Sequence, residues 1–459
     1  MLTDWSSDWS SDNPIFQEKR KQIEIHINTY GLDLVGPGDI FDPKYEEKFI
    51  PAVHEGFAKG QKEILTGLIE IEKDRSSLKR SKSSKNRAAE RKIIHSLERL
   101  NESEAILRKL ADTIAWQLIG NQLWLARRLN TDDSSPSLIH SNVESYISFA
   151  DWFNADNPRG FALISDLTSF VRLGDILARD GDERALHVIE LKEGKVNEEL
   201  LPLAQFAVRT NCEHFIAEVE KKEPPRKFEQ FKRLLKQAER LNRTQELIKT
   251  GAGHDARGDL VRLSKEVLEE RLYEGQLACL IERSKSLNWA IEIVEKCLYL
   301  GVYRGPFCDG RAFDLWLREV ELDGPASDLR SALFVPLATP MYLFPTLAPH
   351  CNDIYSGHIR VLMCLSLSHF AALAEAHEMK VNWVDPKNGT DLNPSHLGHL
   401  LSNKEGNVMT LTFDGFAGNV GTGVVARMFY NFTTPTSVLE MLKSNLILSK
   451  NSVGVDLPK

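Results

Sequence analysis

The chain has 459 residues, of which 42% are hydrophobic and 27% are charged, an ordinary composition for a globular protein of roughly two to four domains. Its formal net charge of −8 argues against a protein coated for nucleic acid, but it leaves room for a local basic channel. Six cysteines without a CxxC pair argue against a disulfide framework or a zinc knuckle, and they favour a cytoplasmic location.

Residues 1–50 form an N-terminal segment that is expected to be partly mobile. The repeat DWSSDWSSD has low complexity and predicts a floppy tail, with a docking peptide anchored by Trp as the alternative. The stretch QIEIHINTY alternates apolar and polar residues and predicts a strand. The first residues are acidic and polar, so no secretory signal is expected.

Residues 51–135 are predicted to be a helical hairpin region, because apolar residues recur there at helical spacing. Between the two arms, Asp74 to Lys92 holds eight basic and two acidic residues. This stretch either contacts phosphate groups or is a solvated connection between the arms. The loop from Thr131 to Ser137 predicts a domain boundary.

Residues 136–303 are predicted to contain a mixed-sheet core. A helix near Val143 precedes the strands FALISDLTSF, FVRLGDILAR and ALHVIELK, and a helix capped by Asn197 follows them. Charge interrupts the apolar runs at Asp175 in the second strand, and at Glu190 and Lys192 in the third. Because alternate residues of a strand share a face, paired strands would bring these three groups together. Buried charges are costly unless a function uses them.

A divalent metal ion would use such a group of charges. Carboxylate oxygens are the ligands that Mg²⁺ prefers, together with waters and substrate phosphates. Asp175 and Glu190 are therefore the expected ligands of Mg²⁺ (or Mn²⁺). Lys192 is expected to position or activate the attacking water, or to stabilise charge on the phosphate.

These residues resemble a known family. The segment GDI, which contains Asp175, and the segment IELK, which ends at Lys192, are similar to the Asp…Glu-x-Lys core of the PD-(D/E)XK (restriction-endonuclease-like) nuclease superfamily. Gly174 stands where the family motif has Pro. The resemblance implies that the Asp opens the second core strand and that Glu-x-Lys lies on the third. It also implies metal-dependent hydrolysis of nucleic acid, with DNA favoured over RNA, and suggests a role in restriction or phage defence.

The resemblance implies further site residues. The family often has an acidic residue on the helix before the sheet, and Glu144 is the candidate, with Asp166 as its rival. An acid in a first helical turn such as Glu144 is also favoured by the helix dipole alone. Gln205 matches a Gln that some branches carry on the helix after the third strand, or it is an ordinary surface residue. Lys195 is expected to contact a phosphate.

A helix is predicted from Pro224-Pro225 to Gly251, with apolar residues on one side. Basic residues occupy the opposite side, and the nucleic-acid contacts expected there are Arg233, Lys236, Arg240 and Arg243. This face either follows a nucleic-acid backbone or is simply solvated.

The rest of the chain is less informative. Residues 259–300 predict a helix and then a strand, WAIEIVEKCLYLGVY, which competes with HFIAEV as the last strand of the nuclease sheet. Residues 304–459 predict a mixed α/β C-terminal domain with an irregular Pro-rich stretch, an apolar helix near 358–378, and a strand pair made by VMTLTFDGF and VVARMFYNF. Asp391, His396 and His399 are a weaker metal candidate.

The predicted fold class is α+β/αβ multidomain, with a restriction-endonuclease-like core between a helical N-terminal region and a mixed C-terminal domain. The predicted function is that of a metal-dependent endo- or exonuclease, with a protein partner or a second copy bound through the helical regions. No membrane span is expected, because the most apolar run is short and interrupted. The alternatives are a non-catalytic partner- or nucleic-acid-binding scaffold with a relic nuclease fold, and a small-molecule hydrolase with a C-terminal pocket.

Overall fold

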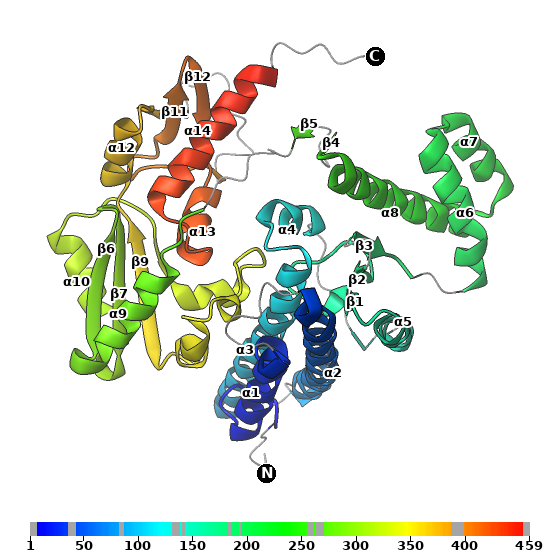
Figure 1. Ribbon diagram of the computed structural model, residues 1–459, viewed down its shortest axis with the longest axis horizontal. Coiled ribbons are helices and arrows are strands. Elements are labelled where there is room, and N and C mark those ends of the chain that lie inside the picture. Colours follow the sequence, from blue (N-terminus) through cyan, green and yellow to red (C-terminus); the bar gives the residue numbers. More distant parts are fainter. Residues whose placement is uncertain are drawn as a thin grey trace. The chain divides into compact units, whose positions relative to one another are not determined.

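The computed structural model describes residues 7–34, 43–81, 87–130, 138–139, 143–181, 185–191, 194–254, 260–262, 270–386 and 399–452. Helices and antiparallel sheets are both present, as the α+β prediction requires (Figure 1). The chain divides into two compact units, Met1–Lys265 and Glu266–Lys459. The predicted scheme instead placed boundaries near residues 50, 135 and 303.

Helices, three of them long, make up the first part of unit 1, as the helical spacing predicted. They are α1 (Pro14–Asn28), α2 (Pro43–Ser81), α3 (Arg87–Leu118) and α4 (Leu123–Leu129). The helices α1, α2 and α3 pack against one another (Figure 1). Their contact faces bury aliphatic side chains, and Ile23, Ile64 and Leu107 among them are fully buried.

The N-terminal segment differs from its prediction. The stretch QIEIHINTY lies largely within α1, because Asn13 caps that helix by accepting a hydrogen bond from the Ile15 N–H, and Pro14 occupies its first turn. Residues 7–12 do not form a loose tail. Trp9 is only 7% exposed, and the Ser11 hydroxyl donates a 2.9 Å hydrogen bond to Glu102 on α3.

A three-stranded antiparallel meander follows, and it confirms the three predicted strands in shortened form. Helix α5 (Val143–Asp156) precedes β1 (Phe161–Ile164), β2 (Ile176–Arg179) and β3 (Leu186–Ile189). The sheet order is β1-β2-β3, and the register pairs Ile164 with Ile176 and Ile176 with Ile189. Every residue of β1 is buried, so this strand lies inside the unit despite its position at the sheet edge.

Side-chain amides replace a neighbouring strand along the open edge of β1. Asn154 of α5 accepts a 2.7 Å hydrogen bond from the Ala162 N–H, and Gln61 of α2 accepts a 2.9 Å bond from the Ile164 N–H. Both amide groups also donate to the Ala162 carbonyl, each at 3.4 Å. Because an unpaired buried backbone group is costly, these two residues tie the meander to the helices on either side of it.

Three helices and a short hairpin complete unit 1. They are α6 (Lys195–Thr210), α7 (Glu213–Lys222), α8 (Pro225–Thr250), β4 (Ala252–His254) and β5 (Leu260–Arg262). The predicted apolar side of α8 is confirmed, because Phe231 and Leu234 are buried against Leu200 and Ala204 of α6. Three predictions fail here: HFIAEV belongs to α7, Leu260 lies in a strand rather than a helix, and the residue that caps α6 is Gly194, not Asn197.

A four-stranded antiparallel sheet organises the first half of unit 2, in the order β6-β7-β9-β8. Its elements are α9 (Glu274–Leu287), β6 (Trp289–Val294), β7 (Leu298–Arg304), α10 (Arg311–Glu319), β8 (Ala326–Asp328) and β9 (Ile359–Leu365). WAIEIVEKCLYLGVY therefore forms a hairpin, turned by Glu295 and Lys296 at positive φ, and not one strand of the β1-β2-β3 sheet. As predicted, the Pro-rich stretch is irregular and consists of short 3₁₀ turns.

A second sheet, in the order β10-β11-β12, completes unit 2. The elements are α11 (Cys351–Tyr355), α12 (Leu367–Ala376), β10 (Lys380–Val384), β11 (Val408–Phe413), β12 (Phe416–Asn419), α13 (Gly423–Tyr430) and α14 (Pro435–Ser452). The apolar helix expected near 358–378 is strand β9 followed by α12. VVARMFYNF is largely helix α13, and the partner of β11 is β12 across the Asp414-Gly415 turn.

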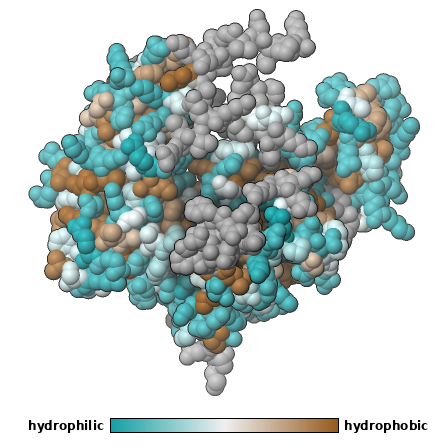
Figure 2. Space-filling model, viewed as in Figure 1, coloured by the Kyte–Doolittle hydropathy of each residue, from teal (hydrophilic) through white to brown (hydrophobic). Residues whose placement is uncertain are grey.

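The described surface carries both polar and apolar side chains. Figure 2 shows hydrophilic residues over much of one face, interrupted by separate hydrophobic patches. None of the helices in the described ranges is both long enough and apolar enough to cross a bilayer.

Candidate functional site

Three carboxylate residues lie at the same end of the strands of the β1-β2-β3 meander. Asp166 follows β1 in a 3₁₀ turn, Asp175 directly precedes β2, and Glu190 directly follows β3. Because the strands are antiparallel, the end of β1, the start of β2 and the end of β3 lie side by side at the same end of the sheet. The short strands therefore bring together two predicted metal ligands and the rival of Glu144.

The electrostatics of Asp166 show that these carboxylates act on one another. Burial, and next the nearby charge of Asp175, raise the pKa of Asp166 to about 6. Arg108 and Arg172 oppose this shift, while Glu190 adds to it. A carboxyl group with a pKa near 6 can change its protonation state close to neutral pH, which is the range that acid–base chemistry uses.

The backbone at Asp175 holds its carboxylate in place. The Leu191 N–H donates a 2.7 Å hydrogen bond to Asp175 Oδ2, and the Asp175 N–H donates to the Ile189 carbonyl at 2.8 Å. Gly174 has a φ of +75°, and a Cβ there would lie 2.5 Å from Val188 Cγ1. Only glycine avoids both the strained backbone and this clash. Glycine at position 174 is thus required by the path of this chain.

Tyr146 on α5 is a member of the site that the sequence reasoning missed. Its hydroxyl donates a hydrogen bond to the Asp175 side chain. Burial raises the pKa of this hydroxyl, and the charges of Asp175, Asp166 and Glu190 raise it further. By contrast, the Glu144 residue is exposed. The sequence signal that pointed to Tyr146 was its position on the buried side of the helix, three residues after Val143 and one turn before Ala150.

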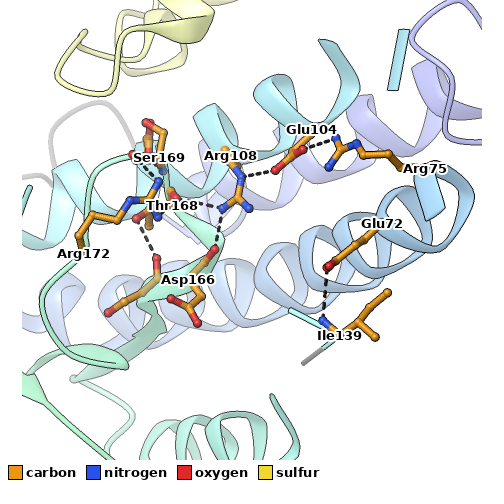
Figure 3. A network of polar contacts seen from close by, with 11 residues as sticks. Glu72, Arg75, Glu104, Arg108, Ile139, Asp166, Thr168, Ser169 and Arg172 are labelled. Atoms are coloured by element: carbon orange, nitrogen blue, oxygen red, sulfur yellow. Dashed lines mark hydrogen bonds and ion pairs between the residues drawn. The ribbon is translucent and has the colours of Figure 1, made fainter. Parts of the chain in front are cut away.

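Arg108 of α3 anchors the turn that carries Asp166. Its Nη1 donates hydrogen bonds to the carbonyls of Asp166 and Thr168, at 2.6 and 3.1 Å, while its Nε donates to Glu104 at 2.9 Å (Figure 3). Arg75 of α2 contacts the same Glu104 carboxylate. Burial opposes ionisation of Glu104, but Arg108 and Arg75 hold the pKa of this carboxyl below its usual value. The helical hairpin therefore fixes the backbone of the acidic turn.

A second anchor on α3 is a buried ion pair. Lys109 Nζ lies 3.1 Å from Asp112 Oδ2, and the two side chains are 1% and 0% exposed. Asp112 also accepts hydrogen bonds from the Ser169 N–H at 2.7 Å and from the Ser169 hydroxyl at 2.5 Å. Burial lowers the pKa of Lys109, although the charge of Asp112 opposes this shift. The pair is costly to desolvate, and its bonds to Ser169 position the loop between β1 and β2.

The site offers carboxylate oxygens, which are the donor type that a hard divalent cation prefers. Mg²⁺ is usually bound by one or two carboxylates, with waters and phosphates completing its octahedron. Asp175 and Glu190, with Asp166 beside them, provide such oxygens, and a cation would relieve the repulsion that raises the pKa of Asp166. Across the described part of the chain, however, no cluster of three or more His, Cys, Asp or Glu side chains could hold a metal ion. Lys192, Asp391 and His396 lie outside the described residues.

The predicted phosphate contacts are placed on two helices. Lys195 is exposed at the first position of α6, directly after the Gly194 cap. On α8, Arg233 and Lys236 are exposed, whereas Arg240 and Arg243 are partly buried. Arg243 already has a partner, because its Nη2 lies 4.0 Å from Glu239 Oε2.

A scan against models of protein families, a search of curated proteins and a search of solved structures found no match to this chain.

Proposed function

We propose that the protein is a metal-dependent nuclease that hydrolyses phosphodiester bonds. The observation that carries this proposal is the meeting of Asp166, Asp175 and Glu190 at one end of the meander, where burial first and then the charge of Asp175 raise the pKa of Asp166 to about 6. The resemblance implies an Asp that opens the second strand and a Glu on the third, whereas Asp175 directly precedes β2 and Glu190 directly follows β3. DNA is favoured over RNA by the same analogy.

Each residue of the site would have a separate role in the reaction. Asp175 and Glu190 would hold Mg²⁺ or Mn²⁺, which when bound polarises a phosphodiester and lowers the pKa of a coordinated water. The Leu191 N–H and the Tyr146 hydroxyl keep the Asp175 carboxylate oriented. Asp166 would accept a proton from the attacking water, and Lys192 would position that water or stabilise charge on the phosphate.

The test uses the purified full-length chain with plasmid, linear and single-stranded DNA and with RNA, each in Mg²⁺ or Mn²⁺. Asp175→Asn, Glu190→Gln and Lys192→Ala should each lower cleavage by at least about a hundredfold. Asp151→Asn, which changes an exposed carboxylate elsewhere on α5, is the matched control and should cleave as the wild type does. If the wild type and all variants behave alike on every substrate, the enzyme proposal fails.

A non-catalytic scaffold is the second candidate. The observation that favours it is the lack, among the described residues, of a cluster of three or more side chains able to hold a metal. A relic nuclease fold would then present the helices of unit 1 to a partner or to nucleic acid. Binding of nucleic acid without any cleavage in the experiment above would support this candidate. A role in restriction or phage defence is compatible with either candidate.

A further inference from the structure

A cavity of about 670 Å³ lies beside Glu190, between β3, α6 and α8. Its volume is in the range of sites that bind small molecules, about 300–1,000 Å³. Apolar side chains from all three elements line it. Four long polar side chains also converge on it, and these are Gln205 and Arg209 of α6 and Gln237 and Asn242 of α8.

The two amides of α8 are free to bind a ligand. Gln237 and Asn242 are exposed residues, and their side chains form no hydrogen bond within the described part of the chain. A side-chain amide presents a donor and an acceptor next to each other. This pair matches the donor–acceptor pairs on the edges of nucleobases, which Asn and Gln recognise in nucleic-acid complexes.

Phe206 offers a stacking surface in the same cavity. Phe215 fixes the ring from one side, with the ring centroids 4.8 Å apart, and Phe206 still remains 40% exposed. The guanidinium of Arg209 lies 5.8 Å from the Phe206 centroid. Unstacked bases bind to aromatic rings and to guanidinium planes in this way. The amides and Arg209 favour a ligand with polar edges, and the exposed Phe206 ring favours a flat one.

We propose that this cavity binds one unstacked nucleobase of a single-stranded nucleic acid, adjacent to the phosphate that is cleaved. The inference rests on the proposed function, because Glu190 is both part of the cavity lining and an expected metal ligand. The exposed Arg233 and Lys236 of α8 are available to the sugar–phosphate backbone. Bases inside a duplex are stacked and paired, so the cavity selects single strands, frayed ends or flipped bases over intact duplex.

The test measures binding by fluorescence anisotropy in EDTA, where metal-dependent cleavage cannot contribute. The probes are short single-stranded DNA and RNA oligonucleotides, and abasic oligonucleotides of the same lengths. The double variant Gln237→Ala plus Asn242→Ala should bind the base-containing strands at least about tenfold more weakly than the wild type. Phe206→Leu should also lower the affinity for the base-containing strands about tenfold, because it keeps an apolar side chain but removes the ring. Gln245→Ala, on the same helix but lining a different cavity, is the control and should bind normally.

The abasic strands separate base recognition from backbone contact. The wild type should bind them as weakly as the double variant binds intact strands. A difference in affinity between the DNA and RNA probes identifies the preferred sugar. Either preference supports the assignment of the cavity to a nucleobase. Equal binding of abasic and intact strands, or an unchanged affinity of the double variant, would overturn the inference.

A parallel incubation in Mg²⁺ distinguishes this result from failure of the proposed function. A protein that binds bases through the two amides but cuts no substrate would refute the nuclease proposal and leave the cavity assignment standing. Circular dichroism melts of all variants should match the wild type, because the changed side chains are exposed or partly exposed.

Discussion

Replacing Asp166 by Asn should make the protein more stable above neutral pH while it abolishes cleavage. The folded structure raises the pKa of this carboxyl from 3.8 to about 6, with burial as the main cause and Asp175 as the next. A raised pKa means that the fold favours the protonated acid, so the ionised form costs stability as the pH rises through about 6. A shift of about two units corresponds to roughly 3 kcal/mol at pH 8. Asn keeps the shape and removes the charge.

The measurement is urea denaturation of wild type and Asp166→Asn at pH 8 and at pH 4. The variant should gain about 3 kcal/mol at pH 8, and its advantage should fall below about 1 kcal/mol at pH 4, where the wild-type carboxyl is protonated in the folded state and only partly ionised in the unfolded chain. Asp151→Asn removes an exposed carboxylate of α5 and should change stability by less than about 0.5 kcal/mol at either pH. No gain at pH 8, or an equal gain at both pH values, would refute the reasoning about the acidic cluster.

Three other predictions follow from the same region and its flanking helix. Tyr146→Phe removes the hydroxyl that orients Asp175 and should raise the Mg²⁺ concentration for half-maximal cleavage by about tenfold; an unchanged metal requirement would exclude a positioning role. Lys109→Met leaves its buried carboxylate partner unpaired and should cost about 3–5 kcal/mol in urea denaturation, whereas a loss under about 1 kcal/mol would contradict the observed burial. Lys236→Ala plus Arg240→Ala should reduce the salt slope of nucleic-acid binding by up to about 2, and an equal slope would remove α8 from the binding path.

The meander and two of its acidic residues could be predicted from the sequence, because the signals were local. An Asp-Gly turn between apolar runs predicts a hairpin, and Asp175 and Glu190 stand out as charges within those runs. Tyr146 could not be found in this way. On a helix it looks like one more member of the stripe that includes Val143 and Ala150, and only the tertiary fold shows that its hydroxyl reaches Asp175.

The wrong predictions come from patterns that fit two structures. In α1, Ile23, Ile25 and Ile27 alternate as in a strand, yet Ile23 and Ile27 are also one helical turn apart. The structure buries these two and leaves Ile25 39% exposed. The cap at Asn13 marks the start of this helix, and it lies outside the alternating stretch. Similarly, Ser366 accepts a hydrogen bond from the His369 N–H and begins α12, which divides one apolar run into a strand and a helix.

The two amides along β1 have a consequence for anyone who wishes to shorten this protein. Gln61 comes from α2, far from the meander in sequence, yet it completes the backbone hydrogen bonds of β1. A fragment that begins at residue 136 would keep every acidic residue of the site and Asn154, but it would lose Gln61 and leave the Ile164 N–H without its partner. The end of β1 that Gln61 covers would then be open to pairing with another copy, so α2 belongs in any shortened version of the protein.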